Sequence, residues 1–301
     1  MPNRGPNAVL QPKPPRVAAR IGCVSFLNAV PLVDGLGGDG EHDVSFDVPS
    51  RLLAQLEDGR VDVALCPVID FHLSRVPLCV VPAGGIASEG ETLTVRLFSR
   101  VPPKDVRTVL ADGDSHTSVV LLQVLLAQQY GVRPRVDRLR AGPAMGAVPE
   151  DCDAMMLIGD KVVTCPPPAA QLPHQVDLGK AWHELTGLPF VFAVWMCRRG
   201  ADLGDLPATL VSVRQRNADR LEHLAAQHAP AHGWSVALAR KYLCEHLQFE
   251  VGPRHVAAMD RFAQMAAELG LIERARPLRT ATKRRSDPDE IGTGSATKGE
   301  S

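Results

Sequence analysis

The chain has 301 residues, of which 45% are hydrophobic, and a formal net charge of -1. This length and hydrophobic content are sufficient for one large domain or for two lobes with buried cores. A nearly neutral chain has no global electrostatic field that attracts nucleic acid or an anionic membrane, so we expect neither as a partner.

The two ends of the chain are predicted to be disordered tails, at residues 1–19 and 277–301. The first is rich in proline and lacks the continuous apolar stretch of a signal peptide, so we expect a cytoplasmic protein. The second has too few apolar side chains to offset the entropy cost of ordering it. The seven cysteines include no C-x-x-C motif and lie mostly in apolar runs, which is typical of buried thiols in a reducing compartment.

Short apolar runs alternate with helical stretches along the first part of the chain, which predicts a parallel α/β organisation. Helices are predicted at 49–58, before Gly59, and at 117–130, before Gly131, because a glycine often ends a helix. From 206 to about 270 the pattern predicts mainly amphipathic helices. The expected strands are 20–26, 43–48, 61–66, 78–83, 92–99, 107–111, 134–139, 153–158 and 188–197.

Two of these strands, 92–99 and 188–197, bracket a central segment that itself has α/β character. This pattern is typical of a two-lobed protein whose chain crosses twice between the lobes. The first lobe would comprise 20–98 plus 198–276 and the second 99–197, with one continuous sheet as the alternative. Ligands of such folds bind beyond the carboxyl ends of parallel strands, where helix N-termini present free N–H groups.

Four loops place small polar groups directly after a predicted strand. Asn28 can cap the helix that follows it, and Ser88 lies in a glycine-containing loop of the kind that holds carboxylates. Asp160 can accept a hydrogen bond from a substrate hydroxyl or cap the next helix. The loops are "SFLNAVP" (25–31), "GGIASEGE" (84–91), "DGDSHTS" (112–118) and "LIGD" (157–160).

The third loop is the most informative of the four. Ser115, Thr117 and Ser118 crowd the N-terminus of a long apolar helix, where one of them is needed as a cap and two are not. His116 lies inside the same loop, although a lone histidine is more often structural than catalytic. With two such loops in each expected lobe, the sequence predicts a small polar anion held between the lobes.

Several sequence motifs of known chemistry are missing. The chain has no G-x-G-x-x-G after a strand, no P-loop, no G-x-S-x-G and no H-E-x-x-H, so nucleotide, phosphoryl, serine-hydrolase and zinc-protease functions lack support. His228 and His232 have the spacing of a helical metal site, but Pro230 interrupts that helix, which favours surface histidines.

The order of these motifs resembles that of the chorismate dehydratases of the futalosine route to menaquinone, over roughly residues 20–275. The resemblance implies the two-lobed fold of the type II periplasmic binding proteins and the dehydration of chorismate to 3-[(1-carboxyvinyl)oxy]benzoate. It implies no metal or organic cofactor and no obligate protein partner. The motifs are "SFLNAVPL", "PSRLLAQLEDGRVDVALCP", "GGIASEGETLTVRLFS", "DSHTSVVLLQVLL", "MLIGD" and "VDLGKAWHELTGLPFVFAVW".

The resemblance also implies roles for the residues of the polar loops. In many relatives an arginine stands between the serine and the threonine of the third loop, where this chain has His116. We expect the enolpyruvyl carboxylate of the substrate to accept the C3 proton, because the loops offer few bases; His116 or Asp160 is the alternative base. The implied catalytic residues are Asn28, Ser88 and Asp160, and the implied substrate-binding residues are Ser25, Ser115, His116, Thr117 and Ser118.

Three other functions are compatible with the same fold. One is 1,4-dihydroxy-6-naphthoate synthase, a sister enzyme with a larger substrate, although "SFLNAVP" with "IASEG" resembles the dehydratase pattern. A transport receptor would have to leave the cytoplasm. A sensor that binds chorismate without turnover would use the same loops.

Overall fold

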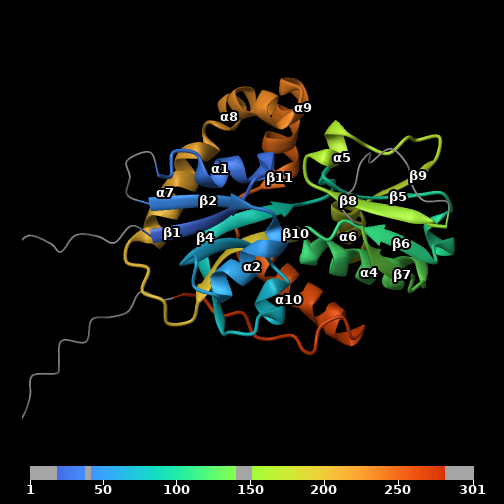
Figure 1. The fold of residues 1–301 in the computed structure, drawn as a ribbon, viewed down its shortest axis with the longest axis horizontal. Helices are drawn as coiled ribbons and strands as arrows, with labels where there is room; N and C mark the ends of the chain where they lie inside the picture. Colours follow the sequence, from blue (N-terminus) through green and yellow to red (C-terminus); the bar gives the residue numbers. More distant parts are fainter. Residues whose placement is uncertain (1–18, 38–41, 140–150, 282–301) are drawn as a thin grey trace, which may run out of the picture.

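The computed structural model describes residues 19–37, 42–139 and 151–281, which form two sheets with separate sets of helices (Figure 1). The larger sheet has the order β11-β4-β10-β3-β1-β2 and the smaller sheet the order β7-β6-β8-β5-β9. The two lobes expected from the sequence are therefore present. The strands are β1 (Ala19–Val24), β2 (His42–Asp47), β3 (Val63–Pro67), β4 (Leu78–Ser88), β5 (Val95–Ser99), β6 (Thr108–Ala111), β7 (Arg135–Arg138), β8 (Ala154–Ile158), β9 (His174–Asp177), β10 (Phe190–Arg198) and β11 (Leu247–Gln248).

The sheets are mixed, so the prediction of parallel sheets is wrong in part. In the larger sheet β1 runs parallel to β2 and β3, whereas β10 runs antiparallel to β3 and β4. In the smaller sheet β6 runs parallel to β7 and β8, whereas β5 runs antiparallel to β8 and β9. Strands β5 and β10 are the first strands after the two crossings, so each enters its sheet from the other lobe. Neither is joined to a neighbouring strand by the crossover helix that parallel pairing requires, and both pair antiparallel.

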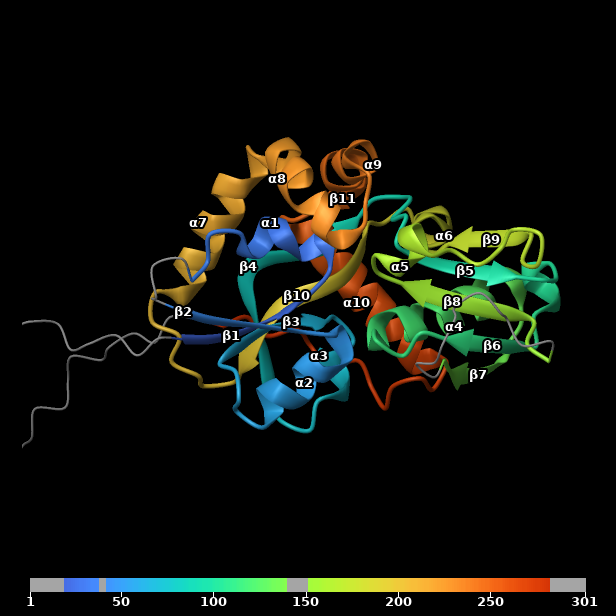
Figure 2. The ribbon, with the colours of Figure 1, turned by 45° about the horizontal axis from the view of Figure 1, so that its top comes forward.

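The helices lie on both sides of each sheet (Figure 2). Helix α4 follows the smaller sheet's β6, and its ends match the sequence signals: the Ser115 hydroxyl accepts a hydrogen bond from Ser118 N at 3.3 Å, and Gly131 ends the helix with φ +67°. The helices are η1 (Leu27–Ala29), α1 (Val30–Val33), α2 (Pro49–Glu57), α3 (Asp70–Leu73), η2 (Pro103–Asp105), α4 (His116–Tyr130), α5 (Lys161–Thr164), α6 (Leu178–Thr186), α7 (Leu206–Ala218), α8 (Leu221–His228), η3 (Ala229–His232), α9 (Val236–Lys241), the π-helical η4 (Tyr242–His246) and α10 (Pro253–Glu268).

The chain crosses from the first lobe to the second between β4 and β5, at 89–94, and returns between α6 and β10, at 187–189. The expected boundaries, after residues 98 and 197, lie too far along the chain. Strand β5 belongs to the second sheet and β10 to the first, so neither strand is itself a crossing.

Buried contacts anchor both crossings. In the first, the Asp177 carboxylate accepts hydrogen bonds from Thr92 N at 3.0 Å and from Leu93 N at 2.9 Å, and it holds Leu93 in the left-handed region with φ +60°. At the second, Trp182 of α6 packs edge-to-face against Phe190 of β10, with ring centroids 5.3 Å apart. Each crossing is therefore fixed by side chains from the lobe that it enters or leaves.

The described end of the chain lies beside the first sheet. Val80 N donates to Arg279 O at 2.7 Å and Ala281 N donates to Val80 O at 2.8 Å, so ordered backbone extends past the expected start of the tail at 277. Residues 282–301 and 1–18 of the expected tails lie outside the described residues, whereas Ala19 begins β1. In the described part of the chain, no helix combines the length and the apolar character needed to span a membrane.

The seven cysteines are free thiols, and five of them are buried, as their apolar surroundings in the sequence predict. Cys165 and Cys244 are exposed and depart from that prediction.

Candidate active site

A cavity of about 50 Å³ lies between the two lobes. Its walls combine apolar side chains with a small number of hydroxyl and amide groups, the composition typical of small-molecule sites. The lining residues are Val24, Phe26, Asn28, Pro49, Pro67, Ile86, Thr92, Thr94, Val95, Ser115, Ser118, Ile158, Gly159, Phe192, Ala193 and Tyr242.

The second lobe contributes the N-terminus of α4 to this cavity. Ser115 caps the helix, and the Ser118 hydroxyl lies 3.1 Å from the Ser115 hydroxyl, so the two lie together on the cavity wall. Both residues are buried, at 7% and 1% exposure. A helix N-terminus carries a partial positive charge, so this wall favours a carboxylate.

The first lobe and the crossing contribute a hydrogen-bonded group of three side chains. The buried Tyr242 hydroxyl lies 2.7 Å from Thr94 Oγ1 and accepts a hydrogen bond from Asn28 Nδ2 at 3.3 Å. The Asn28 Oδ1 atom is buried and has no hydrogen-bond partner among the described residues. A buried acceptor without a donor is costly, so Asn28 offers a ligand in this cavity an unused acceptor.

Among the described residues that line the cavity, Tyr242 is the only titratable one. Burial raises the pKa of Tyr242, against the opposing effect of the hydrogen bonds with Thr94 and Asn28, so the phenol stays protonated at neutral pH. The described lining therefore offers hydroxyl and amide groups, and none of its residues supplies a carboxylate, imidazole or amine that could accept a proton from a substrate.

Five of the eight residues expected to bind or act on substrate lie outside the lining of this cavity, namely Ser25, Ser88, His116, Thr117 and Asp160. Ser25 is exposed and lines a neighbouring surface pocket of about 400 Å³, which also contains Phe46 and His228. Ser88 is fully buried at the end of β4, where its hydroxyl donates to Gly90 O at 3.4 Å. Ser88 thus contacts the first crossing, which leads to the cavity residue Thr92.

His116 and Thr117, on the first turn of α4, form contacts between the lobes instead of lining the cavity. His116 Nδ1 lies 2.7 Å from the fully buried carboxylate of Asp70, and Thr117 Oγ1 accepts a hydrogen bond from Ile69 N at 3.1 Å. The hydrogen bond with Asp70 raises the pKa of His116, and burial raises the pKa of Asp70. These contacts dock the N-terminus of α4 on the first lobe.

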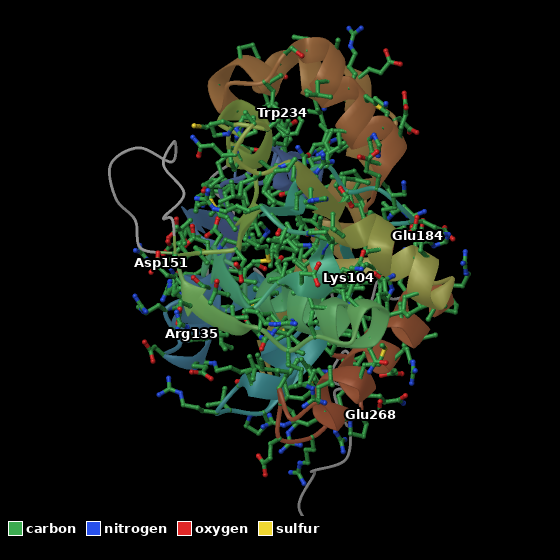
Figure 3. The ribbon with its side chains drawn as sticks, turned by 90° about the vertical axis from the view of Figure 1, so that its right-hand side faces the viewer. Lys104, Arg135, Asp151, Glu184, Trp234 and Glu268 are labelled. Carbon is green, nitrogen blue, oxygen red and sulfur yellow. The ribbon has the colours of Figure 1, made fainter. Side chains whose placement is uncertain are left out.

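Asp160 also spans the two lobes and does not line the cavity. Its carboxylate lies 2.8 Å from His232 Nδ1 and accepts hydrogen bonds from Trp234 Nε1 at 3.0 Å and from Leu27 N at 3.3 Å. Figure 3 looks onto the second lobe and shows Trp234 at the top, among the helices that follow β10. His228 and His232, favoured above as surface histidines, are partly buried and contact the carboxylates of Asp34 and Asp160. The described residues contain no group of three or more His, Cys, Asp and Glu that could hold a metal ion.

Thr94 and Tyr242 were not predicted as site residues from the sequence. Thr94 precedes β5 and Tyr242 begins η4, and neither stands in a loop of small polar residues. The two are separated by 148 positions, so only the fold brings their hydroxyls together. The one available signal was that Thr94 lies inside the "GGIASEGETLTVRLFS" motif.

Comparison with solved structures places the fold among the type II solute-binding proteins. The chain is similar to the periplasmic aliphatic sulphonate binding protein SsuA of Escherichia coli, with a TM-score of 0.61 and 18% identity over 95% of this chain and 98% of that chain. It is similar to the alkanesulfonate-binding protein SsuA of Xanthomonas axonopodis pv. citri, bound to MOPS, with a TM-score of 0.61 and 14% identity over 86% and 94% of the two chains. The fold is therefore that of a two-lobed binding protein.

Comparison of the sequence identifies the family. The chain belongs to a family described as menaquinone biosynthesis, whose model matches residues 19–268. It is 29% identical over 238 residues to the chorismate dehydratase of Thermus thermophilus, a match that covers 74% of this chain and 86% of the relative.

Proposed function

We propose that this protein is a chorismate dehydratase that converts chorismate to 3-[(1-carboxyvinyl)oxy]benzoate and water, at the start of the futalosine route to menaquinone. The observation that carries the proposal is the cavity between the lobes, whose polar groups are hydroxyls and an amide beside the N-terminus of α4. Membership of the menaquinone biosynthesis family and the similarity to a chorismate dehydratase support it.

The α4 wall of the cavity suits the ring carboxylate of chorismate. The Ser115 hydroxyl, which accepts hydrogen bonds from Ser118 N and Oγ, would donate a hydrogen bond to it, and the Ser118 hydroxyl would turn from Ser115 to do the same. The partial positive charge of the helix N-terminus would favour its negative charge. Loss of the C3 proton delocalises charge into this carboxylate through the ring diene. Donors fixed at that position would therefore stabilise the transition state more than the ground state.

The lining of the cavity favours an internal base. In the part of the chain that the structure describes, its single titratable group, Tyr242, is a protonated phenol at neutral pH. In the proposed elimination, the enolpyruvyl carboxylate takes the C3 proton, the electrons of the C3–H bond form the new ring double bond, and the C4 hydroxyl leaves. The proton carried by the carboxylate converts that hydroxyl to water, so the products are an aromatic ring and one water molecule.

Asn28 is the proposed ligand of the C4 hydroxyl. Its Oδ1 atom is buried at the cavity without a partner among the described residues, and its Nδ2 group is held by the Tyr242 hydroxyl. A substrate hydroxyl would supply the missing donor and orient the leaving group toward the proton-bearing carboxylate. The cavity of about 50 Å³ has room for a few water molecules and not for a ten-carbon diacid, so the lobes would separate to admit substrate.

Incubating the purified protein with chorismate, and identifying the products by liquid chromatography and mass spectrometry, tests the proposal. A new aromatic product lighter than chorismate by one water is expected, with its rate of formation strongly reduced in Asn28→Ala. Chorismate that raises the melting temperature but is recovered unchanged would instead establish a binding protein.

The proposed compartment is the cytoplasm, where the seven free thiols would stay reduced.

A further inference from the structure

The geometry points to Asp160 as a positioning residue that couples closure of the lobes to the alignment of Asn28 and Tyr242. This inference rests on the proposed dehydration, and it assigns Asp160 a role other than contact with the substrate. Asp160 follows β8 of the second lobe, but all three groups that its carboxylate contacts belong to the first lobe or to the helices packed on it. We call Asp160, Leu27, His232 and Trp234 the Asp160 clasp.

Two paths of contacts, which we call the arms of the clasp, start at Asp160. The first arm runs through Leu27 to Asn28. Leu27 N, which donates to Asp160 at 3.3 Å, opens the short helix η1, and Asn28 is the next residue of that helix. No side chain caps η1 from within its own segment, so the carboxylate of the other lobe satisfies this N–H group. The position of Asn28 at the cavity therefore depends on Asp160.

The second arm runs through Trp234 to Tyr242. The Trp234 Nε1 group donates to Asp160 at 3.0 Å, and the Trp234 ring stacks on the Tyr242 ring with centroids 4.9 Å apart and an interplanar angle of 18°. The Tyr242 hydroxyl in turn binds Asn28 and Thr94. Both arms of the clasp thus end on the same hydrogen-bonded group in the cavity.

The turn before Asp160 brings the clasp close to the cavity. Gly159 has φ +71° and lies on the cavity wall, and its N–H group donates to Thr94 O at 2.8 Å. A Cβ atom at this position would lie 2.9 Å from the ring of Phe26, the residue before Leu27. The positive φ and the close approach of the Phe26 ring therefore favour glycine, and this turn places the Asp160 carboxylate against the start of η1.

Two substitutions test the contacts of the clasp. Asp160→Asn keeps the shape of the side chain but replaces one carboxylate oxygen with an NH₂ group. This group would face a donor, Leu27 N or Trp234 Nε1, and could not accept its hydrogen bond. Trp234→Phe keeps an aromatic ring beside Tyr242 but removes the Nε1–H donor together with part of the indole ring. The matched control is Asp153→Asn, because Asp153 accepts hydrogen bonds from Arg107 N at 2.8 Å and Thr108 N at 2.9 Å entirely within the second lobe.

The steady-state kinetics of chorismate dehydration distinguish positioning from a general structural role. We expect Asp160→Asn to lower kcat about tenfold with KM changed less than threefold, and Trp234→Phe to lower kcat less. The double variant should be no slower than Asp160→Asn, because both changes break the same path, whereas independent effects would multiply. Asp153→Asn should lower the melting temperature and leave kcat unchanged.

Hydrogen exchange measures the clasp independently of turnover. The Leu27 amide should exchange at least tenfold faster in Asp160→Asn than in the wild type, and at the wild-type rate in Asp153→Asn. Unchanged exchange at Leu27, an unchanged kcat in Asp160→Asn, or multiplicative effects in the double variant would each overturn the inference. If the wild type does not dehydrate chorismate, the proposed function fails, and the exchange rates still report whether Asp160 holds η1.

Discussion

Substitution of Tyr242 by phenylalanine removes one oxygen atom from the centre of the proposed site. The Tyr242 side chain is fully buried, and its hydroxyl joins Thr94, at 2.7 Å, to Asn28, at 3.3 Å. In Tyr242→Phe both partners lose this hydrogen bond. Asn28 then has no partner for either end of its amide among the described residues, and its orientation in the cavity is no longer fixed.

The expected magnitude follows from these two hydrogen bonds. Each contributes about 1 kcal/mol net to folding, and the bond to Asn28 is long, so the free energy of unfolding should fall by about 1–2 kcal/mol. The effect on catalysis should be roughly tenfold in kcat, because Asn28 is still present but is less well oriented. Removal of the amide itself should cost more.

Urea denaturation and steady-state kinetics with chorismate measure both effects. The other tyrosine of the chain, Tyr130, provides the control, because it is half-buried on α4 and does not line the cavity. Tyr130→Phe should keep the wild-type kcat. A Tyr242→Phe variant with wild-type kcat and KM would show that the Tyr242 hydroxyl does not orient a catalytic group, and would refute this part of the account.

Three further predictions concern other parts of the site. Asn28→Ala should lower kcat about 10²- to 10³-fold in the chorismate assay, as expected for loss of an oriented polar group, with the fold retained by circular dichroism. Gly159→Ala should lower the free energy of unfolding by about 1–3 kcal/mol in urea, because it adds a clash to an unfavourable φ, whereas Gly187→Ala, with φ +69° and open space around it, should lose less. The pKa of His116 is raised from 6.5 by its buried carboxylate partner, so its stabilising contribution is complete below pH 6.5 and is lost as the pH rises through the raised pKa. The melting temperature of the wild type should therefore fall more steeply over that range than that of His116→Asn.

Local sequence signals predicted the elements that build the α4 wall. Ser115 at the start of the helix and Gly131 after its end are sufficient to place α4, because caps act within a few residues of the helix end. The same signals placed Ser115 and Ser118 at a ligand site. Strand β9, His174–Asp177, was not predicted, because its polar sequence lacks an apolar strand pattern.

The direction of the strands and the orientation of several polar side chains could not be predicted from local sequence. Apolar periodicity is the same in parallel and antiparallel strands, so it does not show that β10 returns antiparallel from the second lobe. Asp160 was placed correctly after a strand, but its contact with Trp234, 74 positions away, depends on how the lobes meet. Ser25 and Thr117 likewise lie in the expected loops, but Ser25 lines a surface pocket and Thr117 accepts a hydrogen bond from Ile69 N.

The fate of the C3 hydrogen of chorismate tests the proposed function most directly. Chorismate carrying deuterium at C3 would be incubated with the purified protein, and the mass of the product would be measured. We expect an aromatic product without deuterium, formed by loss of the C3 deuteron and the C4 hydroxyl. Unconverted chorismate, or a product that retains the deuterium, would contradict it.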